Sequence, residues 1–174
     1  MGGVGLKKVR RTVVPRPRVV VLGPEDAGAC VALEIAAFDG PDRFPARIWR
    51  RLLGPCQEAG TALAIGVRAP RGVLAAAAIA LLRRGRRTAR IYSLAVDPGF
   101  RGQGLGAALI EAVARRTGLG LSLEVSVANA PARALYERLG FIAGETLRDY
   151  YAMGHHGIRY RRPLAHPRKP RIPR

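Results

Sequence analysis

One ten-residue stretch constrains the fold of this chain more than any other. The sequence DPGFRGQGLG (97–106) holds four glycines and one proline, and it lies between the apolar runs IYSLAV (91–96) and AALIEAVA (107–114). A strand that leads through glycines into a helix start gathers free backbone N–H groups at the positive end of the helix, with no side chains to hold a ligand off. The stretch therefore predicts an anion site, with phosphate as the usual occupant.

Periodic patterns on both sides of the glycine stretch predict alternating strands and helices. Apolar residues recur at helical spacing between Leu105 and Thr117, and strict alternation in LSLEVSV (121–127) sets Glu124 on the polar face of a strand. The predicted strands are 18–23, 61–69, 72–82, the end of 83–96, 121–127, 141–151 and 156–164. The predicted helices run from Glu25 to about Phe38, over 46–53, over 105–117, and from an Asn129 cap to Gly140. This order indicates an α/β fold with a mixed sheet.

Length and charge predict one folded domain with two basic arms. The chain has 174 residues, is 48% hydrophobic and carries a formal charge of +18. Twelve of its 30 basic residues lie in 1–18 and 161–174, which contain no acid. We expect arms at 1–18 and 165–174 around a domain at 19–164. The arms are interpreted either as solvated tails or as an electrostatic footprint for the ribosome, RNA or another polyanion.

The sequence argues against a membrane-spanning segment, a signal peptide and a metal site. No apolar run is long enough to span a membrane, and the N-terminus lacks the apolar region of a signal peptide, so the expected location is the cytoplasm. Cys30 and Cys56 lack a CxxC spacing and are expected to be buried, reduced thiols. His155 and His156 are adjacent, so on an extended segment they point to opposite faces, and no metal site is expected.

The glycine stretch differs from two common phosphate-binding loops. A Walker loop needs Gly-Lys-Ser/Thr, and a dinucleotide loop needs a third glycine at a spacing that GQGLG does not have. RGQGLG (101–106) does fit the Q/R-x-x-G-x-G/A pattern and resembles the GNAT superfamily of N-acetyltransferases. Together with LEVSVANAPARALYERLGF (123–141) and LRDYY (147–151), it resembles the branch of bacterial ribosomal-protein alanine N-acetyltransferases and archaeal N-terminal acetyltransferases.

This resemblance implies a fold and a co-substrate. The implied fold is a mixed, mostly antiparallel sheet of about seven strands flanked by helices, with a parallel strand pair that splays at the cofactor site. The implied co-substrate is acetyl-CoA. Backbone groups of Leu94, Ala95 and Val96 would pair with its pantetheine arm, and Asn129 would contact it near the sulfur. Its pyrophosphate would lie on the glycine loop, formed by Arg101, Gly102, Gln103, Gly104, Leu105, Gly106 and Ala107.

The resemblance also assigns the chemistry and the acceptor. Glu124 resembles the proton acceptor of the family and Tyr136 its proton donor, while Phe38, Tyr150 and Tyr151 would contact the acceptor. The expected reaction is acetyl transfer to a protein or peptide amine, with an N-terminal α-amine favoured. Two alternatives stay open: acetylation of a small-molecule amine, and a ribosome- or nucleic-acid-binding protein that keeps the GNAT fold.

Overall fold

The computed structural model describes residues 17–38 and 43–164. Residues 1–16 and 165–174, which make up nearly all of the two predicted arms, lie outside the described residues. The division of the chain into two arms and a domain therefore stays a prediction.

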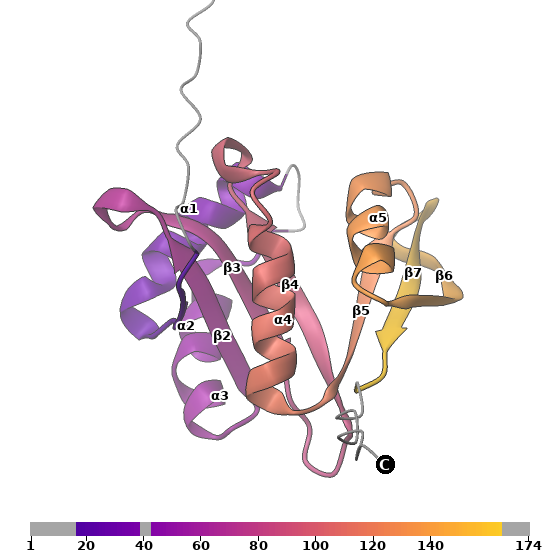
Figure 1. Ribbon diagram of the computed structural model, residues 1–174, viewed down its shortest axis with the longest axis horizontal. Coiled ribbons are helices and arrows are strands. Elements are labelled where there is room, and N and C mark those ends of the chain that lie inside the picture. The colour runs from indigo at the N-terminus through magenta and orange to yellow at the C-terminus, as the bar shows by residue number, and fades with distance from the viewer. Residues whose placement is uncertain (1–16, 39–42, 165–174) are drawn as a thin grey trace, which may run out of the picture.

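A seven-stranded sheet with the order β1-β2-β3-β4-β5-β7-β6 forms the centre of the molecule (Figure 1). Its strands are β1 (Val19–Val21), β2 (Ala62–Arg68), β3 (Leu74–Leu81), β4 (Thr88–Val96), β5 (Gly120–Ser126), β6 (Ile142–Ala152) and β7 (His155–Arg162). Every neighbouring pair is antiparallel except β4 and β5, which are parallel. The structure thus confirms the predicted α/β class and the mixed, mostly antiparallel sheet.

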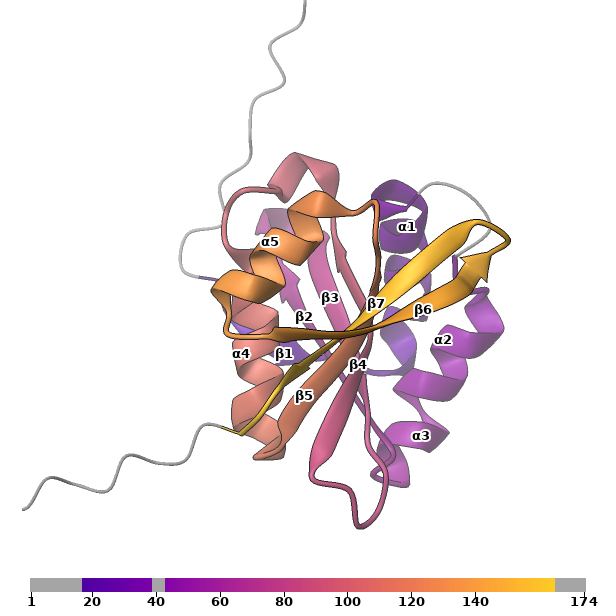
Figure 2. The ribbon, with the colours of Figure 1, turned by 90° about the vertical axis from the view of Figure 1, so that its right-hand side faces the viewer.

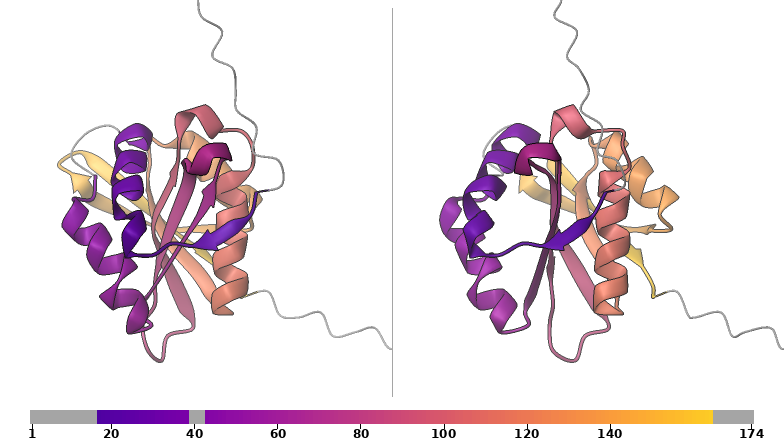
Figure 3. Two further views of the ribbon diagram at one scale, coloured as in Figure 1. Left: turned by 90° about the vertical axis from the view of Figure 1, so that its left-hand side faces the viewer. Right: turned by 60° about the vertical axis from the view of Figure 1, so that its left-hand side comes forward.

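Helices cover both faces of the sheet. The helices α1 (Ala27–Ala37), α2 (Ala46–Leu53) and α3 (Pro55–Glu58) pack on one face, and α4 (Leu105–Thr117) packs on the other (Figure 3). The last helix, α5 (Ala130–Arg138), lies beside β5 and in front of β4 together with the β6–β7 hairpin (Figure 2). Among the described residues, no helix is long and apolar enough to cross a membrane.

The apolar, alanine-rich run VLAAAAIALL (73–82) contains strand β3. Ala76 and Ala78 belong to the core under α4, whereas Ala77 and Ile79 belong to the core under α1 and α2. A strand that is buried on both faces reads as a continuous apolar run, and its small side chains let helices approach from both sides. The alanines therefore follow from double burial, although alanine alone prefers helices.

The structure changes some element boundaries. Strand β1 has three residues, fewer than predicted, and the turn η1 (Pro24–Asp26) is a 3-10 helix that precedes α1. Helix α3 was not predicted, because four residues are too few to show a helical period. Cys30 is buried, as expected, and burial raises the pKa of its thiol to about 12. Cys56, by contrast, is only half-buried.

Candidate active site

Strands β4 and β5 separate soon after they begin. Their parallel pairing covers only Thr88–Gly120, Ala89–Leu121 and Arg90–Ser122, and the remaining part of β4 is paired only on its β3 side. The N–H group of Asp97 donates to Ala75 O (3.0 Å), so in this antiparallel ladder the alternate residues Leu94 and Val96 turn their backbone groups away from β3. Their N–H and C=O groups therefore face the gap between β4 and β5.

The glycine stretch closes one end of this gap. Gly102 and Gly104 both have φ near +75°, and Gly104 is the residue that precedes the first turn of α4. This left-handed backbone favours glycine, and a Cβ on Gly104 would meet no atom within 4 Å, because the space beside it is open. The N-terminus of a 13-residue helix, with its unpaired N–H groups and positive dipole end, thus faces an open space.

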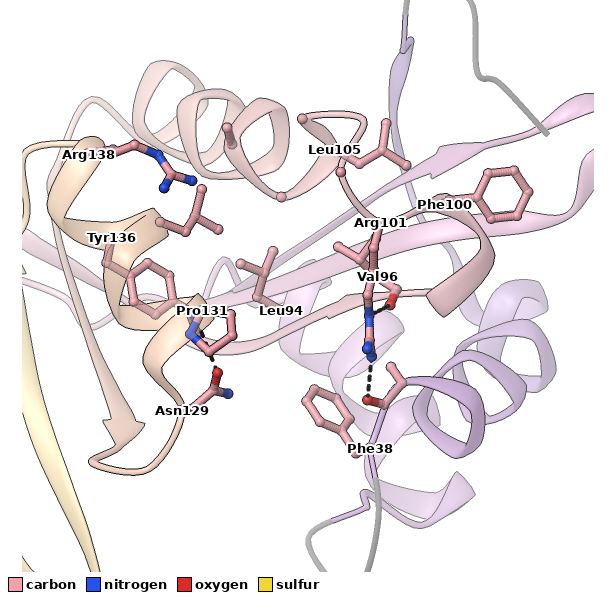
Figure 4. A pocket seen from close by; sticks show the side chains of 17 residues that line it. Phe38, Leu94, Val96, Phe100, Arg101, Leu105, Asn129, Pro131, Tyr136 and Arg138 are labelled. Atoms are coloured by element: carbon pink, nitrogen blue, oxygen red, sulfur yellow. Dashed lines mark hydrogen bonds between the residues drawn. The ribbon is translucent and has the colours of Figure 1, made fainter. Parts of the chain in front are cut away.

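A cavity of about 710 Å³ occupies this space (Figure 4). Most of the predicted cofactor residues line it: Leu94, Val96, Arg101, Gly102, Gly104, Leu105, Gly106, Ala107 and Asn129. Two predicted cofactor residues, Ala95 and Gln103, are not among its lining residues. The Ala95 side chain is buried in the core under α1 and α2, and its backbone faces its partner Ala77 on β3 rather than the gap.

The cavity also contains cationic side chains. Arg138, from the end of α5, lines it and was missed by the sequence analysis, because a basic residue in the last turn of a helix has an ordinary explanation in the helix dipole. Arg101 donates from its guanidinium to Ala37 O (3.0 Å) and so links the glycine stretch to the end of α1 (Figure 4).

A second cavity of about 560 Å³ lies in the same splayed region of the sheet. It contains the predicted base and the three predicted acceptor residues: Glu124, Phe38, Tyr150 and Tyr151. Five residues line both cavities: Phe38, Leu94, Asn129, Ala132 and Tyr136. The two cavities therefore share a wall, and the candidate proton donor is part of that wall.

Glu124 is held by two arginines in the second cavity. Arg90 Nε, from β4, donates to Glu124 Oε2 (2.8 Å), and Arg159 Nε, from β7, donates to Oε1 (2.9 Å). The carboxylate side chain is only 7% exposed, so its charge is compensated by the two guanidinium groups rather than by water. Arg90 also donates to the Tyr150 hydroxyl (2.6 Å), which ties β6 to the same network.

Tyr136 lies in the wall shared by the two cavities. Its ring packs against Phe141 (5.6 Å between ring centroids) and Tyr160 (6.1 Å), and the residue is 8% exposed. Burial raises the pKa of its phenol to about 12, so the hydroxyl keeps its proton near neutral pH. On the same wall, Asn129 Oδ1 accepts from Ala132 N (3.1 Å), which caps α5 and fixes the asparagine side chain.

A second carboxylate lines the second cavity and was missed by the sequence analysis. Glu34, on α1, is 1% exposed and accepts from Ser93 Oγ (2.8 Å) and Phe44 N (3.4 Å). Within the described residues no cation pairs with it, and burial raises the pKa of its carboxyl. The available signal was that Glu34 is the one charged residue in the helix AGACVALEIAA.

No metal cluster accompanies these residues. Across 17–38 and 43–164, no group of three or more His, Cys, Asp or Glu side chains could hold a metal ion. His155 lines the second cavity, and the adjacent His156 accepts at Nδ1 from the backbone N–H of Asp149 (3.1 Å).

Comparisons with known proteins agree with this geometry. The family model described as "Acetyltransferase (GNAT) family" matches residues 35–141. The chain is 45% identical over 67 residues to the [Ribosomal protein bS18]-alanine N-acetyltransferase of Escherichia coli K12, covering 36% of this chain and 45% of that protein. It is 36% identical over 89 residues to an N-alpha-acetyltransferase of Saccharolobus solfataricus, covering 48% of this chain and 51% of that protein. The matched segment thus spans about half the length of these curated relatives.

A solved structure extends the similarity to most of the fold. The crystal structure of the ribosomal-protein-S18-alanine N-acetyltransferase from Escherichia coli superposes with a TM-score of 0.73 at 28% identity. The alignment covers 89% of this chain and 97% of that chain. With a family model that matches more than half of its length, the chain belongs to the GNAT family of acetyltransferases.

Proposed function

We propose that this protein is an acetyl-CoA-dependent N-acetyltransferase that acetylates the N-terminal α-amine of a protein or peptide. The observation that carries the proposal is the pair of cavities with a shared wall at Asn129 and Tyr136. One cavity ends at the glycine stretch, where backbone N–H groups suit an anion, and the other contains the buried side chains of Glu34 and Glu124. An acyl donor in the first and an amine in the second would meet at the proton donor.

The first cavity fits acetyl-CoA, which supplies the acetyl group as a thioester. The open space beside Gly104, at the N-terminus of α4, suits a pyrophosphate, because backbone N–H groups and the helix dipole favour anions there. Arg138 adds a cation to the same cavity. Further along the gap, the backbone groups of Leu94 and Val96 can pair with the amides of a pantetheine arm as they would with a strand.

Glu124 and Tyr136 are the proposed proton carriers. Glu124 takes the proton of the acceptor amine through a water molecule, and the freed nitrogen attacks the thioester carbonyl carbon. Tyr136 Oη then donates its proton to the departing thiolate. Because its pKa is raised to about 12, the phenol of Tyr136 is protonated near neutral pH and can donate this proton.

The favoured acceptor follows from amine chemistry and from the relatives. An α-amine has a pKa of about 7.7–8.0, against about 10.4 for lysine, so it needs a weaker base. Both curated relatives described above carry names that state N-terminal or alanine N-acetylation. The protein would act in the cytoplasm on such an acceptor, and contact of the arms 1–18 and 165–174 with ribosome or RNA stays a prediction.

The pH dependence of Glu124→Gln tests both the base and the acceptor class. About a tenth of an α-amine is neutral at pH 7, so the variant should be slow there and recover much of its rate by about pH 9. With a lysine acceptor the neutral fraction at pH 7 is on the order of one in a few thousand, and the rate would still rise at about pH 10. The measurement is the initial rate of Glu124→Gln with a peptide acceptor at saturating acetyl-CoA, taken from about pH 7 to about pH 10.

Two controls separate the base from its surroundings. Glu145→Gln removes another ion pair of Arg159 at an exposed carboxylate, so its pH profile should match that of the unmodified protein. Tyr136→Phe removes the proton donor for the thiolate, so alkaline pH should not restore its rate. If Glu124→Gln matches the unmodified protein at every pH, Glu124 is not the base.

A further inference from the structure

Exposed arginines from two segments gather at the end of the sheet opposite to the glycine stretch. The turn between β3 and β4 contributes four of them, and the last turn of α4 contributes two. We call this surface the basic end, and it consists of Arg83, Arg84, Arg86, Arg87, Arg115 and Arg116.

The two segments are neighbours because β4 and β5 begin together. Gly120 N donates to Arg87 O (3.0 Å), and Thr88 and Gly120 are partners in the parallel pair. Helix α4 ends at Thr117, three residues before Gly120. Figure 1 shows the β3–β4 turn and the C-terminal end of α4 together at the lower end of the molecule.

The arginines of the basic end have no carboxylate partners among residues 17–38 and 43–164. Some arginines of these residues do pair, for example Arg68 with Asp26 and Arg162 with Glu111, whereas the exposed arginines of α2 also form no ion pair within them. The helix dipole explains two cations at the end of α4. It does not explain four more on the adjacent turn, where like charges repel each other and add nothing to the stability of the fold.

We propose that the basic end binds the phosphodiester backbone of a nucleic acid. Guanidinium groups form paired hydrogen bonds with phosphate oxygens, and clustered cations release the counterions of a polyanion. The turn RRGRRT (83–88) and the segment RRTG (115–118) contain no apolar side chain that could enter a lipid layer. A nucleic acid is therefore a better partner for this surface than a membrane.

Two further observations support this partner. The described chain ends beside the basic end, since Leu164 N lies 3.2 Å from the position of a Cβ on Gly120. From that point the sequence continues with four more cations, Arg168, Lys169, Arg171 and Arg174. In addition, the 13 residues of α4 span about 20 Å, which separates the basic end from the glycine stretch. Acetyl-CoA and a nucleic acid can thus bind at the same time.

The test compares two triple variants of the full chain that lose the same charge. One replaces Arg83, Arg84 and Arg86 by Gln, and the control replaces the exposed Arg47, Arg50 and Arg51 of α2 by Gln. Fluorescence anisotropy would measure binding to a labelled RNA duplex and a labelled DNA duplex between about 50 and 200 mM salt. The turn variant should bind at least about tenfold more weakly at about 0.1 M salt, and its slope of log K against log salt should fall by about two to three.

The control variant should lose much less affinity, and both variants should acetylate a short peptide at the unmodified rate. Equal losses in the two triples would mean that net charge, not the basic end, determines binding. Unchanged affinity in the turn variant, or binding to anionic phospholipid vesicles but to neither duplex, would also overturn the proposal. A preference for RNA or for DNA would identify which nucleic acid supplies the phosphates.

Discussion

The substitution Gly104→Asp should remove most of the affinity of the protein for CoA while leaving the fold intact. Gly104 has φ near +75°, ψ near 8° and open space around its missing side chain. Asp and Asn tolerate this left-handed backbone better than other residues, so the strain costs about 1 kcal/mol, equivalent to about 2–4 °C in Tm for a chain of this size. An Asp at this position would face the phosphate-binding N–H groups with a negative charge.

The size of the effect follows from the hydrogen bonds at risk. A hydrogen bond to a charged group contributes about 1.5–3 kcal/mol, so loss of one lowers affinity by about 10- to 150-fold. Gly104→Asn has nearly the same size and backbone tolerance as Gly104→Asp but no charge. The difference in CoA affinity between the two variants therefore measures electrostatic repulsion, and it should shrink as salt is added.

Gly118→Asp provides the matched control for backbone strain. Gly118 ends the same helix with φ near +62°, and a Cβ there would also meet no atom within 4 Å. Its variant should lose at least as much stability, because a carboxylate at the C-terminal end of a helix is also opposed by the helix dipole, and it should keep full CoA affinity. Isothermal titration calorimetry with CoA, together with thermal unfolding, would measure both quantities. If Gly104→Asp binds CoA as tightly as Gly118→Asp does, the glycine stretch does not hold the pyrophosphate.

Two further predictions concern buried positions. The pKa of Glu34 is raised in the folded state, so its contribution to stability is largest below the ordinary pKa of glutamate and is lost as pH rises through the raised value. The Tm of the unmodified protein should therefore fall relative to that of Glu34→Gln as the pH rises above the ordinary pKa of glutamate, and parallel Tm curves would contradict this. Gly66→Ala would place a Cβ 2.8 Å from Leu74 Cδ1 and 3.0 Å from Ala76 O, and we expect a loss of about 1–3 kcal/mol, or about 2–12 °C in Tm. Gly28→Ala is its control, since a Cβ there meets no atom within 4 Å and a helix gains stability from the change; equal Tm values for the two variants would refute the packing argument.

Much of the fold could be predicted because local patterns and tertiary contacts agree. The alternation around Glu124 corresponds to a strand with one buried face, and the apolar spacing of 105–117 corresponds to a helix that packs on the sheet. The turn chemistry at Asn129 was also readable, because a side-chain cap depends on residues three positions apart.

The parts of the site that were missed depend on contacts between distant segments. Glu34 lines the second cavity, where its carboxyl group is held by hydrogen bonds from Ser93 and Phe44, which belong to other parts of the chain. Likewise, the polar face of β5 did not reveal that Arg90 and Arg159 both bind Glu124, since these partners lie 34 and 35 positions away. Patterns within one element cannot specify such partners.

If the short parallel pairing of β4 and β5 acts as a pivot, the two halves of the sheet rotate relative to each other about it. Within the described residues, the backbone pairing between the two halves of the sheet is limited to the three pairs from Thr88 to Arg90, and Asn129 and Tyr136 belong to the half that carries α5. Rotation about this pivot would widen or narrow both cavities together. A ligand that contacts both walls would restrict that rotation for the other ligand as well. By thermodynamic reciprocity, donor and acceptor would then each change the affinity of the protein for the other by the same factor.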